Sequence, residues 1–163
     1  MAVVDYFLKL DGIPGESPDA KHKDEIQVLS FSFGANQSGT MAFGGGGGAG
    51  KVAMQDFHFM MHVNKASPKL FLACATGDHI KSGILTCRKA GKEQQEYLKV
   101  KFSDLLVSSF QTNGDGAGNH PVPVESISLN FSKIEWDYKV QNEKGQLVPG
   151  AVAGYDVKAN KAV

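Results

Sequence analysis

Segment 45–51 is the first place where residue types and spacing resemble a chemical motif. It matches Gly-x-x-x-x-Gly-Lys, the front of a phosphate-binding loop, which requires a Ser or Thr next for Mg²⁺ and then a helix. Here Val52 follows, and the next residues alternate with the period of a strand. Six of the seven residues in 44–50 are glycine, so the match carries little information. We therefore predict that segment 35–50 is a long extended loop that faces solvent or a partner, without a nucleotide.

Two histidines, His58 and His62, are four residues apart, a spacing that suits a zinc site on a helix. The residues around them alternate as in a strand, on which the two imidazoles would lie about 13 Å apart. The stretch lacks the glutamate of a zinc-protease motif, and the chain has no Gly-x-Ser-x-Gly elbow and no convincing pair of carboxylates. We expect no catalytic residue, no metal site and no cofactor.

Small polar residues form a different pattern on two of the expected strands. Ser30 and Ser32, and later Ser126, Ser128 and Asn130, alternate with apolar residues. Alternation on a strand puts such residues on the face opposite the core. That face is either ordinary solvent-exposed surface or the wall of a water-filled space or a partner contact, and the residues alone leave both readings open.

Length and charge exclude several classes of protein. The 163 residues fit one domain, 1–163, with a real core. Lys plus Arg and Asp plus Glu both number 17, so the net charge is zero, which argues against a nucleic-acid partner and favours self-association. The apolar runs are too short to enter a membrane, and residues 1–5 carry no signal-peptide pattern. Cys74 and Cys87 are expected to be buried, reduced thiols.

Period-two alternation predicts strands along most of the chain. In the strand 26–33, Leu29, Phe31 and Phe33 are predicted to face the core, with Val28 on the other face beside the serines. The remaining short strands are expected at 6–10, 52–63, 80–88 and 154–157, followed by a polar tail at 158–163.

One helix is predicted, and it interrupts the strands. Ser67 is a suitable N-cap, Pro68 suits the first turn and Gly77 suits the end. Leu70, Phe71 and Cys74 form its expected apolar stripe. A helix this short must dock on a sheet to be stable.

The strands 97–110 and 124–140 are too long to be straight. Each would extend about 45–55 Å, whereas a compact domain of this length is about 39 Å across. The apolar phase slips at Ser132-Lys133 in one strand and after Ser103-Asp104 in the other, as bulges require. We therefore predict a mainly β fold, in which two packed antiparallel sheets form a β-barrel with one short α-helix and a long Gly-rich loop.

Several segments together resemble a known family over nearly the whole chain, although no single segment is specific. They are 1–3, 15–17, 25–34, 37–39, 44–52, 55–56, 65–74, 88–91, 95–98, 107–109, 124–131 and 154–156. The combination resembles the haemolysin-coregulated protein (Hcp) family of bacterial type VI secretion. Segment 113–123 and the tail after Val157 do not contribute to the resemblance.

The resemblance implies a structural protein rather than an enzyme. Family members form homohexameric rings that stack into the inner tube of a contractile injection apparatus. The expected partners are further copies of the chain, the spike protein, the contractile sheath, and small effectors carried in the lumen. The protein would be cytoplasmic before assembly and would then be secreted without a signal peptide. The six residues after Val157 leave no room for an appended toxin domain.

The resemblance also assigns roles to residues. It puts the strand of Ser30 and Ser32 on the inner wall of the ring, so Ser32, with Ser30 as the second candidate, is expected to face effectors. The loop is expected to contact a neighbouring ring or subunit. Its residues in that role are Gly39, Gly44, Gly45, Gly46, Gly47, Gly48, Gly50 and Lys51.

Two alternatives to a type VI tube subunit remain at the level of sequence. One is a phage-like tail-tube or baseplate protein outside a type VI system. The other is a small-molecule-binding barrel or a hydrolase, which would stay monomeric near 17.5 kDa.

Overall fold

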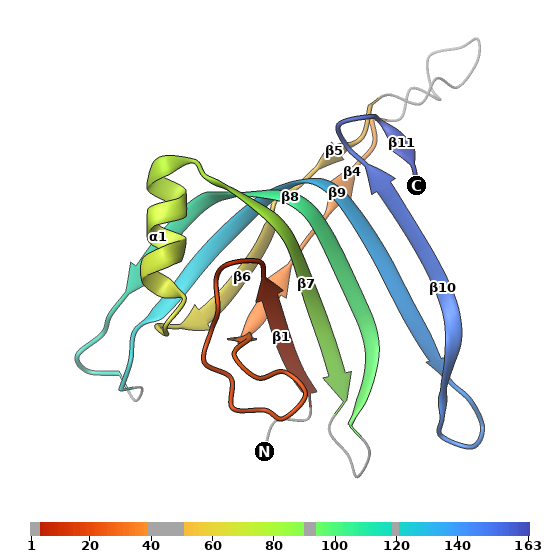
Figure 1. Ribbon diagram of the computed structural model, residues 1–163, viewed down its shortest axis with the longest axis horizontal. Helices are drawn as coiled ribbons and strands as arrows, with labels where there is room; N and C mark the ends of the chain where they lie inside the picture. Colours follow the sequence, from red (N-terminus) through yellow and green to blue (C-terminus); the bar gives the residue numbers. More distant parts are fainter. Residues whose placement is uncertain (1–3, 39–50, 90–93, 119–120) are drawn as a thin grey trace.

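The computed structural model describes residues 4–38, 51–89, 94–118 and 121–163. The described part is mainly β with one helix, as predicted (Figure 1). Its elements are β1 (Val4–Leu10), β2 (Ile26–Val28), β3 (Ser30–Ser32), β4 (Ala35–Asn36), β5 (Ala53–Met54), β6 (Phe57–His62), α1 (Ser67–Thr76), β7 (His79–Lys89), β8 (Gln95–Asn113), β9 (Val124–Gln141), β10 (Leu147–Asp156) and β11 (Lys161–Ala162).

The strands form one large antiparallel sheet and one small one. Nine strands belong to the large sheet, whose main path runs β11-β10-β9-β8-β7-β1-β2, while β6 pairs with β9 and β3 pairs with β6. The small sheet is the ribbon β4–β5. The prediction of a mainly β fold with two sheets and one short helix is confirmed, and the large sheet curls over itself to supply both walls of the core.

The curled sheet is not a closed cylinder of strand pairs. Strand β2 pairs with β1, and after Leu29 the chain continues as β3, which pairs with β6. At this corner the backbone N–H of Leu29 donates to the carbonyl of Met60 at 2.8 Å. The barrel therefore holds together at this seam through the chain itself and one bridging hydrogen bond.

Strands β8 and β9 bend at the same level, where the sequence predicts it. Asp104 has a φ of +52°, and Ser132 Oγ on the facing strand donates to the carbonyl of Ser103 at 2.9 Å. Buried side chains change from even to odd numbers along β8, from Phe102 to Leu105. The bend lets both strands, at 19 and 18 residues, stay within a small domain.

The predicted assignment of side chains to the two faces of strand 26–33 is wrong in part. Ile26 and Val28 are buried, Leu29 is 49% exposed, and Phe31 packs against the core. The side-chain alternation is reset at Leu29, because the chain turns there from pairing with β1 to pairing with β6. Simple alternation therefore placed Leu29 and Val28 on the wrong faces.

Helix α1 occupies the predicted residues but begins and packs differently. Its N-cap is Ala66, and the Ser67 hydroxyl donates to the buried Glu125 carboxylate instead of capping the helix. At the other end Gly77 adopts a φ of 73°, as expected for a glycine stop. Leu70 is buried, but Phe71 is 58% exposed, so the predicted apolar stripe is wrong at that residue.

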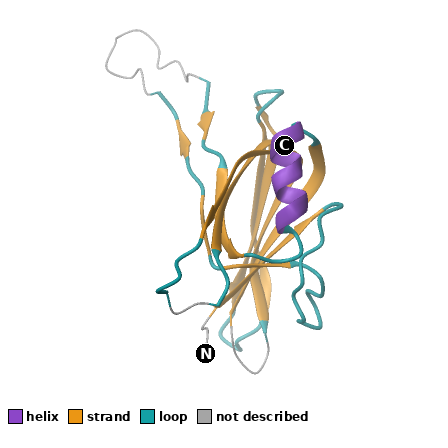
Figure 2. Ribbon diagram, turned by 90° about the vertical axis from the view of Figure 1, so that its left-hand side faces the viewer, coloured by secondary structure: helices purple, strands orange, loops and turns teal. Residues whose placement is uncertain are grey.

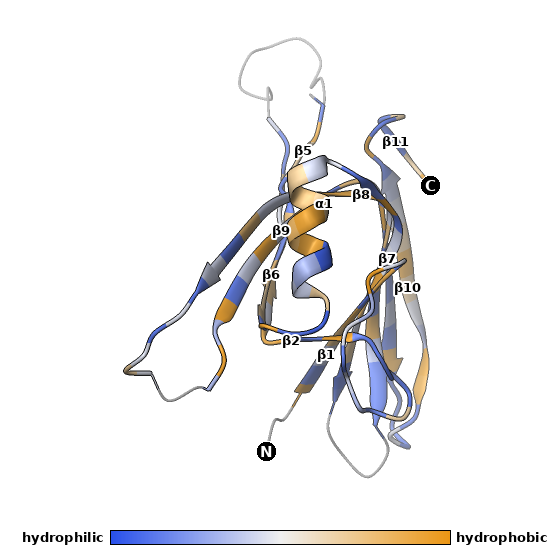
Figure 3. Ribbon diagram, turned by 60° about the vertical axis from the view of Figure 1, so that its left-hand side comes forward, coloured by the Kyte–Doolittle hydropathy of each residue, from blue (hydrophilic) through white to orange (hydrophobic). Residues whose placement is uncertain are grey.

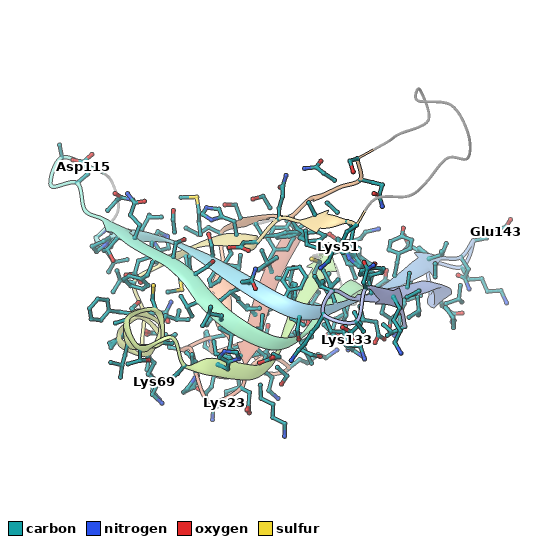
Figure 4. All side chains as sticks on the ribbon, turned by 90° about the horizontal axis from the view of Figure 1, so that it is seen from above. Lys23, Lys51, Lys69, Asp115, Lys133 and Glu143 are labelled. Carbon is teal, nitrogen blue, oxygen red and sulfur yellow. The ribbon has the colours of Figure 1, made fainter. Side chains whose placement is uncertain are left out.

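Strand β10 is longer than the predicted 154–157. It runs over ten residues from Leu147 and pairs with β9 throughout, with a register shift between Pro149 and Ala151. Every residue of β10 is exposed or half-buried, so burial imposes no clear alternation on its sequence. The β9–β10 hairpin extends beyond the barrel and carries Glu143 at its tip (Figure 4).

A charged clamp holds the loop between β1 and β2 against the barrel. The Arg88 side chain is only 3% exposed, and its Nη2 lies 2.7 Å from Asp19 and 3.0 Å from Asp5. Hydrogen bonding to Arg88 lowers the pKa of Asp19 from 3.8 to about 2. Nearby, the ring of His22 stacks on Phe7 with centroids 4.4 Å apart.

The clamp predicts acid sensitivity. We expect Asp19→Asn to lower the free energy of unfolding at pH 7 by about 2 kcal/mol, since one pKa unit corresponds to about 1.4 kcal/mol. Because the pKa of Asp19 is lower in the folded state, the wild type keeps this contribution above about pH 4 and loses it as the pH falls towards 2. Urea denaturation at both ends of this range measures the difference between the two proteins.

The exposed Asp11 provides the matched control. We expect Asp11→Asn to change the free energy of unfolding by less than about 0.5 kcal/mol at either pH. A deficit in Asp19→Asn that is as large at pH 2 as at pH 7 would show that the charge of Asp19 is not its source.

Candidate functional site

The outer face of four neighbouring strands carries the serines singled out in the sequence. In one cross-strand row Ser30 lies opposite Met60, Met60 opposite Ser126, and Ser126 opposite Gln111. The next row contains Ser32, His58, Ser128 and Ser109. We call this surface of β3, β6, β9 and β8 the serine face, and define it by the eight residues of these two rows.

Hydrogen bonds between neighbouring strands order the serine face. His58 Nδ1 and Ser128 Oγ are 2.9 Å apart. Beside this row, the Asp56 carboxylate accepts from Ser108 Oγ at 2.6 Å and from Asn130 Nδ2 at 2.9 Å. These contacts connect residues of β8 and β9 with residues of, or next to, β6 at the outer surface.

The opposite side of the same strands is the rigid core. Its fully buried side chains interleave with the serine-face residues along β6 and β9, as alternation requires. They are Phe57, Phe59, Met61, Ile127 and Leu129. Tight packing on one side therefore fixes the positions of the hydroxyl groups on the other side.

The two rows of the serine face contain no Asp, Glu, Lys or Arg, and the Asp56 carboxylate borders them. Within 30–32, 57–62, 107–113 and 124–130 the one charged residue is Glu125, and it points inward. Glu125 is 2% exposed and accepts hydrogen bonds from Ser67 and from Thr112 Oγ1, the latter at 2.5 Å. Hydroxyl, amide and imidazole groups that bind water remain on the outer side.

The geometry of the face does not assemble a catalytic set. His58 contacts Ser128, but the neighbouring carboxylate of Asp56 is engaged by Ser108 and Asn130 rather than by the imidazole. A nucleophilic serine requires a base that is itself oriented by a third group. Among the described residues no group of three or more His, Cys, Asp or Glu side chains is arranged to hold a metal ion.

The two cysteines are separate in the fold. Cys87 is buried and Cys74 is half-buried, and both are free thiols. Burial raises the pKa of Cys87 to about 11, so this thiol is inert near neutral pH.

The predicted loop site is only partly within the described residues. Gly39, Gly44, Gly45, Gly46, Gly47, Gly48 and Gly50 lie outside them, and so do residues 90–93. Lys51 is described and exposed. The ribbon β4–β5, in which Ala35 faces Met54, projects beyond the barrel (Figure 2). We call this ribbon, together with Lys51, the arm.

Sequence reasoning missed part of the serine face. Ser109 and Gln111 belong to it, but they follow a register shift between Val107 and Ser109 that moves them onto the outer side. The successive polar residues at 108–109 inside an apolar strand were the available signal for that bulge.

Comparison with known proteins places this geometry in a family. The family model described as "Type VI secretion system effector, Hcp" matches residues 7–138. Protein hcp1 of Pseudomonas aeruginosa strain PAO1 is 43% identical over 159 residues, which cover 96% of this chain and 97% of that protein.

Solved structures agree with the family match. Hcp1 from Salmonella typhimurium superposes with a TM-score of 0.82 at 41% identity, over 99% of this chain and 100% of that one. A structure described as a type six secretion system protein gives a TM-score of 0.91 at 30% identity, over 98% and 99% of the two chains. The chain therefore belongs to the Hcp family of type VI secretion proteins, as its sequence indicates.

No described helix is long and apolar enough to cross a membrane. The assignment to type VI secretion rests on the family match.

The placement of Ser32 and Phe31 on opposite faces predicts opposite effects of substitution. We expect Ser32→Gln to change the free energy of unfolding by less than about 0.5 kcal/mol, because the side chain is exposed. Phe31→Ala should cost about 3 kcal/mol, because Phe31 packs on Tyr6 and Phe57 with ring centroids 5.0 and 5.9 Å apart. Chemical denaturation measures both values, and a comparable loss in Ser32→Gln would mean that the serine face is a packed surface of the folded subunit.

Proposed function

We propose that this chain is the structural subunit of a type VI secretion tube, in which six copies close a ring with the serine face lining the channel. The rings stack into a tube inside the sheath and beneath the spike, and the channel carries small effectors. The observation that carries this proposal is the hydroxyl-rich outer face of β3, β6, β9 and β8, whose two cross-strand rows contain no Asp, Glu, Lys or Arg.

The sheet that bears the serine face has two unused edges, and these favour a ring. Among the described strands, β3 pairs only with β6, so its other edge is open. The pairing of β7 with β8 ends at Leu106, so the rest of that edge of β8 is open as well. Open edges expose unpaired backbone groups and need to be covered. Contacts between two different edges of identical subunits are heterologous and close into a ring when the rotation permits.

The chemistry of the face suits a passage for folded cargo. Small hydroxyl groups hold water and carry no fixed charge, so a protein moving past them meets no strong field. Larger charged side chains would narrow the channel and attract or repel cargo according to its charge. Ser32 and Ser30 are accordingly our candidates for contact with effectors.

The two ends of the subunit differ in a way that supports stacking. The ribbon β4–β5 projects from one end, and β1 begins near the other (Figure 1). Beside β1 is a groove of about 760 Å³ whose lining includes Val4, Leu29, Val63 and Glu16. Lys51 on the arm and Glu16 at the groove have opposite charges, so we propose that the arm of one ring contacts the groove end of the next.

The same proposal covers export and the absence of catalysis. We infer that the chain acts as a structural protein, because His58 and Ser128 lack an orienting carboxylate. Export would occur by ejection of the assembled tube from the cytoplasm.

Ser32→Asp tests the channel role. We expect the variant to assemble and to be secreted as the wild type is, while the amount of effector protein in the medium falls several-fold, because a ring of six added charges alters the channel surface. Quantitative mass spectrometry of the medium gives the ratio of effectors to the tube protein, and light scattering gives the native mass of each purified protein.

Ser82→Asp is the matched control, since Ser82 is exposed on β7 and lies outside the serine face. It should leave the effector ratio unchanged. A wild type that remains near 17.5 kDa at all concentrations would contradict the ring. Unchanged effector export by hexameric Ser32→Asp would contradict the inward orientation of the face.

A further inference from the structure

Most of the large apolar side chains that are exposed in the described residues gather at three places; Val152 and Val163 lie outside them. The groove end carries one group, the helix carries the second, and the β9–β10 hairpin carries the third. In that order they are Val4, Leu29, Val63 and Val122; Phe71 and Leu72; and Tyr138, Val140 and Val148. Contiguous exposed apolar surface on a protein of this size marks contact with another molecule.

The helix patch consists of Phe71 and Leu72 on α1. They are 58% and 57% exposed, and Phe71 rests against Phe110 of β8 with ring centroids 5.9 Å apart. The middle of α1 has the colour of hydrophobic residues in Figure 3. Phe110 lies on the part of β8 that β7 no longer covers, so the helix patch adjoins one of the two open edges.

The hairpin patch consists of Tyr138, Val140 and Val148. Val148 lies directly opposite Val140, and both share a face with Tyr138 because strand residues two apart point the same way. They continue the face that holds buried Ile134 and half-buried Trp136 further along β9. The core face of the sheet thus runs out beyond the barrel with no described element covering it.

The hairpin patch begins beside the other open edge. Phe33, which follows β3, packs on Trp136 with ring centroids 6.0 Å apart. Helix α1 and strand β10 lie on opposite sides of the subunit (Figure 1). Each open edge of the serine-face sheet is therefore flanked by one apolar patch, and the two patches lie on opposite sides of the subunit (Figure 1).

We infer that the helix patch of one subunit packs against the hairpin patch of the next copy in the ring. This inference rests on the proposed function and names the surfaces that close the ring. Two different patches on opposite sides of one chain can only satisfy each other in a head-to-tail contact, which is the kind that forms a closed ring. A single patch meeting its own copy would give a dimer and leave the other patch exposed.

Acidic substitutions on each patch test the inference by native mass. We expect Val140→Asp and Phe71→Asp each to reduce the mass from six times 17.5 kDa to that of the monomer under conditions where the wild type is a ring. Val152→Asp is the matched control, because Val152 is on the same hairpin, is 64% exposed and pairs with Asp137 on the opposite face. It should remain hexameric, and circular dichroism should show all three variants folded.

Cross-linking distinguishes the head-to-tail arrangement from other contacts. In a Cys74→Ser background, Leu72→Cys and Val140→Cys together should give a ladder up to six subunits with a short bismaleimide, while each alone should give only monomer. Buried Cys87 does not react, because burial raises its pKa to about 11.

The outcomes separate this inference from the proposed function. A monomeric wild type would contradict the ring itself. A hexameric wild type with no ladder from the double variant, or with hexameric Val140→Asp, would overturn only the assignment of the interface. Cross-linked dimers from Val140→Cys alone would also overturn it, because they would show the hairpin patch meeting its own copy.

Discussion

Strands β6 and β10 pair with the same edge of β9, each along a different half, and the rest of the structure depends on this division. One edge of β9 pairs with β8 along most of its length. The other edge pairs with β6 over 124–129 and with β10 over 133–141. The bend at Ser132 and Asp104 separates the two halves, so that the sheet turns one way to close the core and the other way to form a projecting hairpin. A straight β9 would leave either the core wall or the hairpin unpaired.

The division of β9 gives the two halves different chemistry. The first half presents buried apolar residues inward and serines outward, which fixes the serine face on a rigid support. The second half carries its core face out beyond the barrel, where Tyr138 and Val140 are 47% and 44% exposed. One strand thereby supplies both the proposed channel wall and part of the proposed contact between subunits. A closed assembly of identical subunits would give both surfaces a function, whereas a monomer would expose the hairpin patch to water.

Local patterns predicted most of the fold, and they failed where tertiary contacts decide. The phase slip at Ser132 was readable because core residues mark both sides of it, and the glycine stop of α1 needs only local geometry. The corner at Leu29 was not readable, because the switch of partner from β1 to β6 is a long-range event. Strand β10 was mostly missed because none of its residues is fully buried by the described part of the chain. The serine pattern was visible in the sequence, but only pairing across four strands joined Ser32 to His58, Ser128 and Ser109.

An electron cryo-microscopy reconstruction of the purified chain tests the central claim most directly, since it shows both the assembly and the orientation of the subunit. We predict a six-fold ring in which β3, β6, β9 and β8 form the inner wall, with Ser32 and Ser128 facing the channel. A ring with this face on its outer surface, or a preparation that contains only single subunits, would contradict the account.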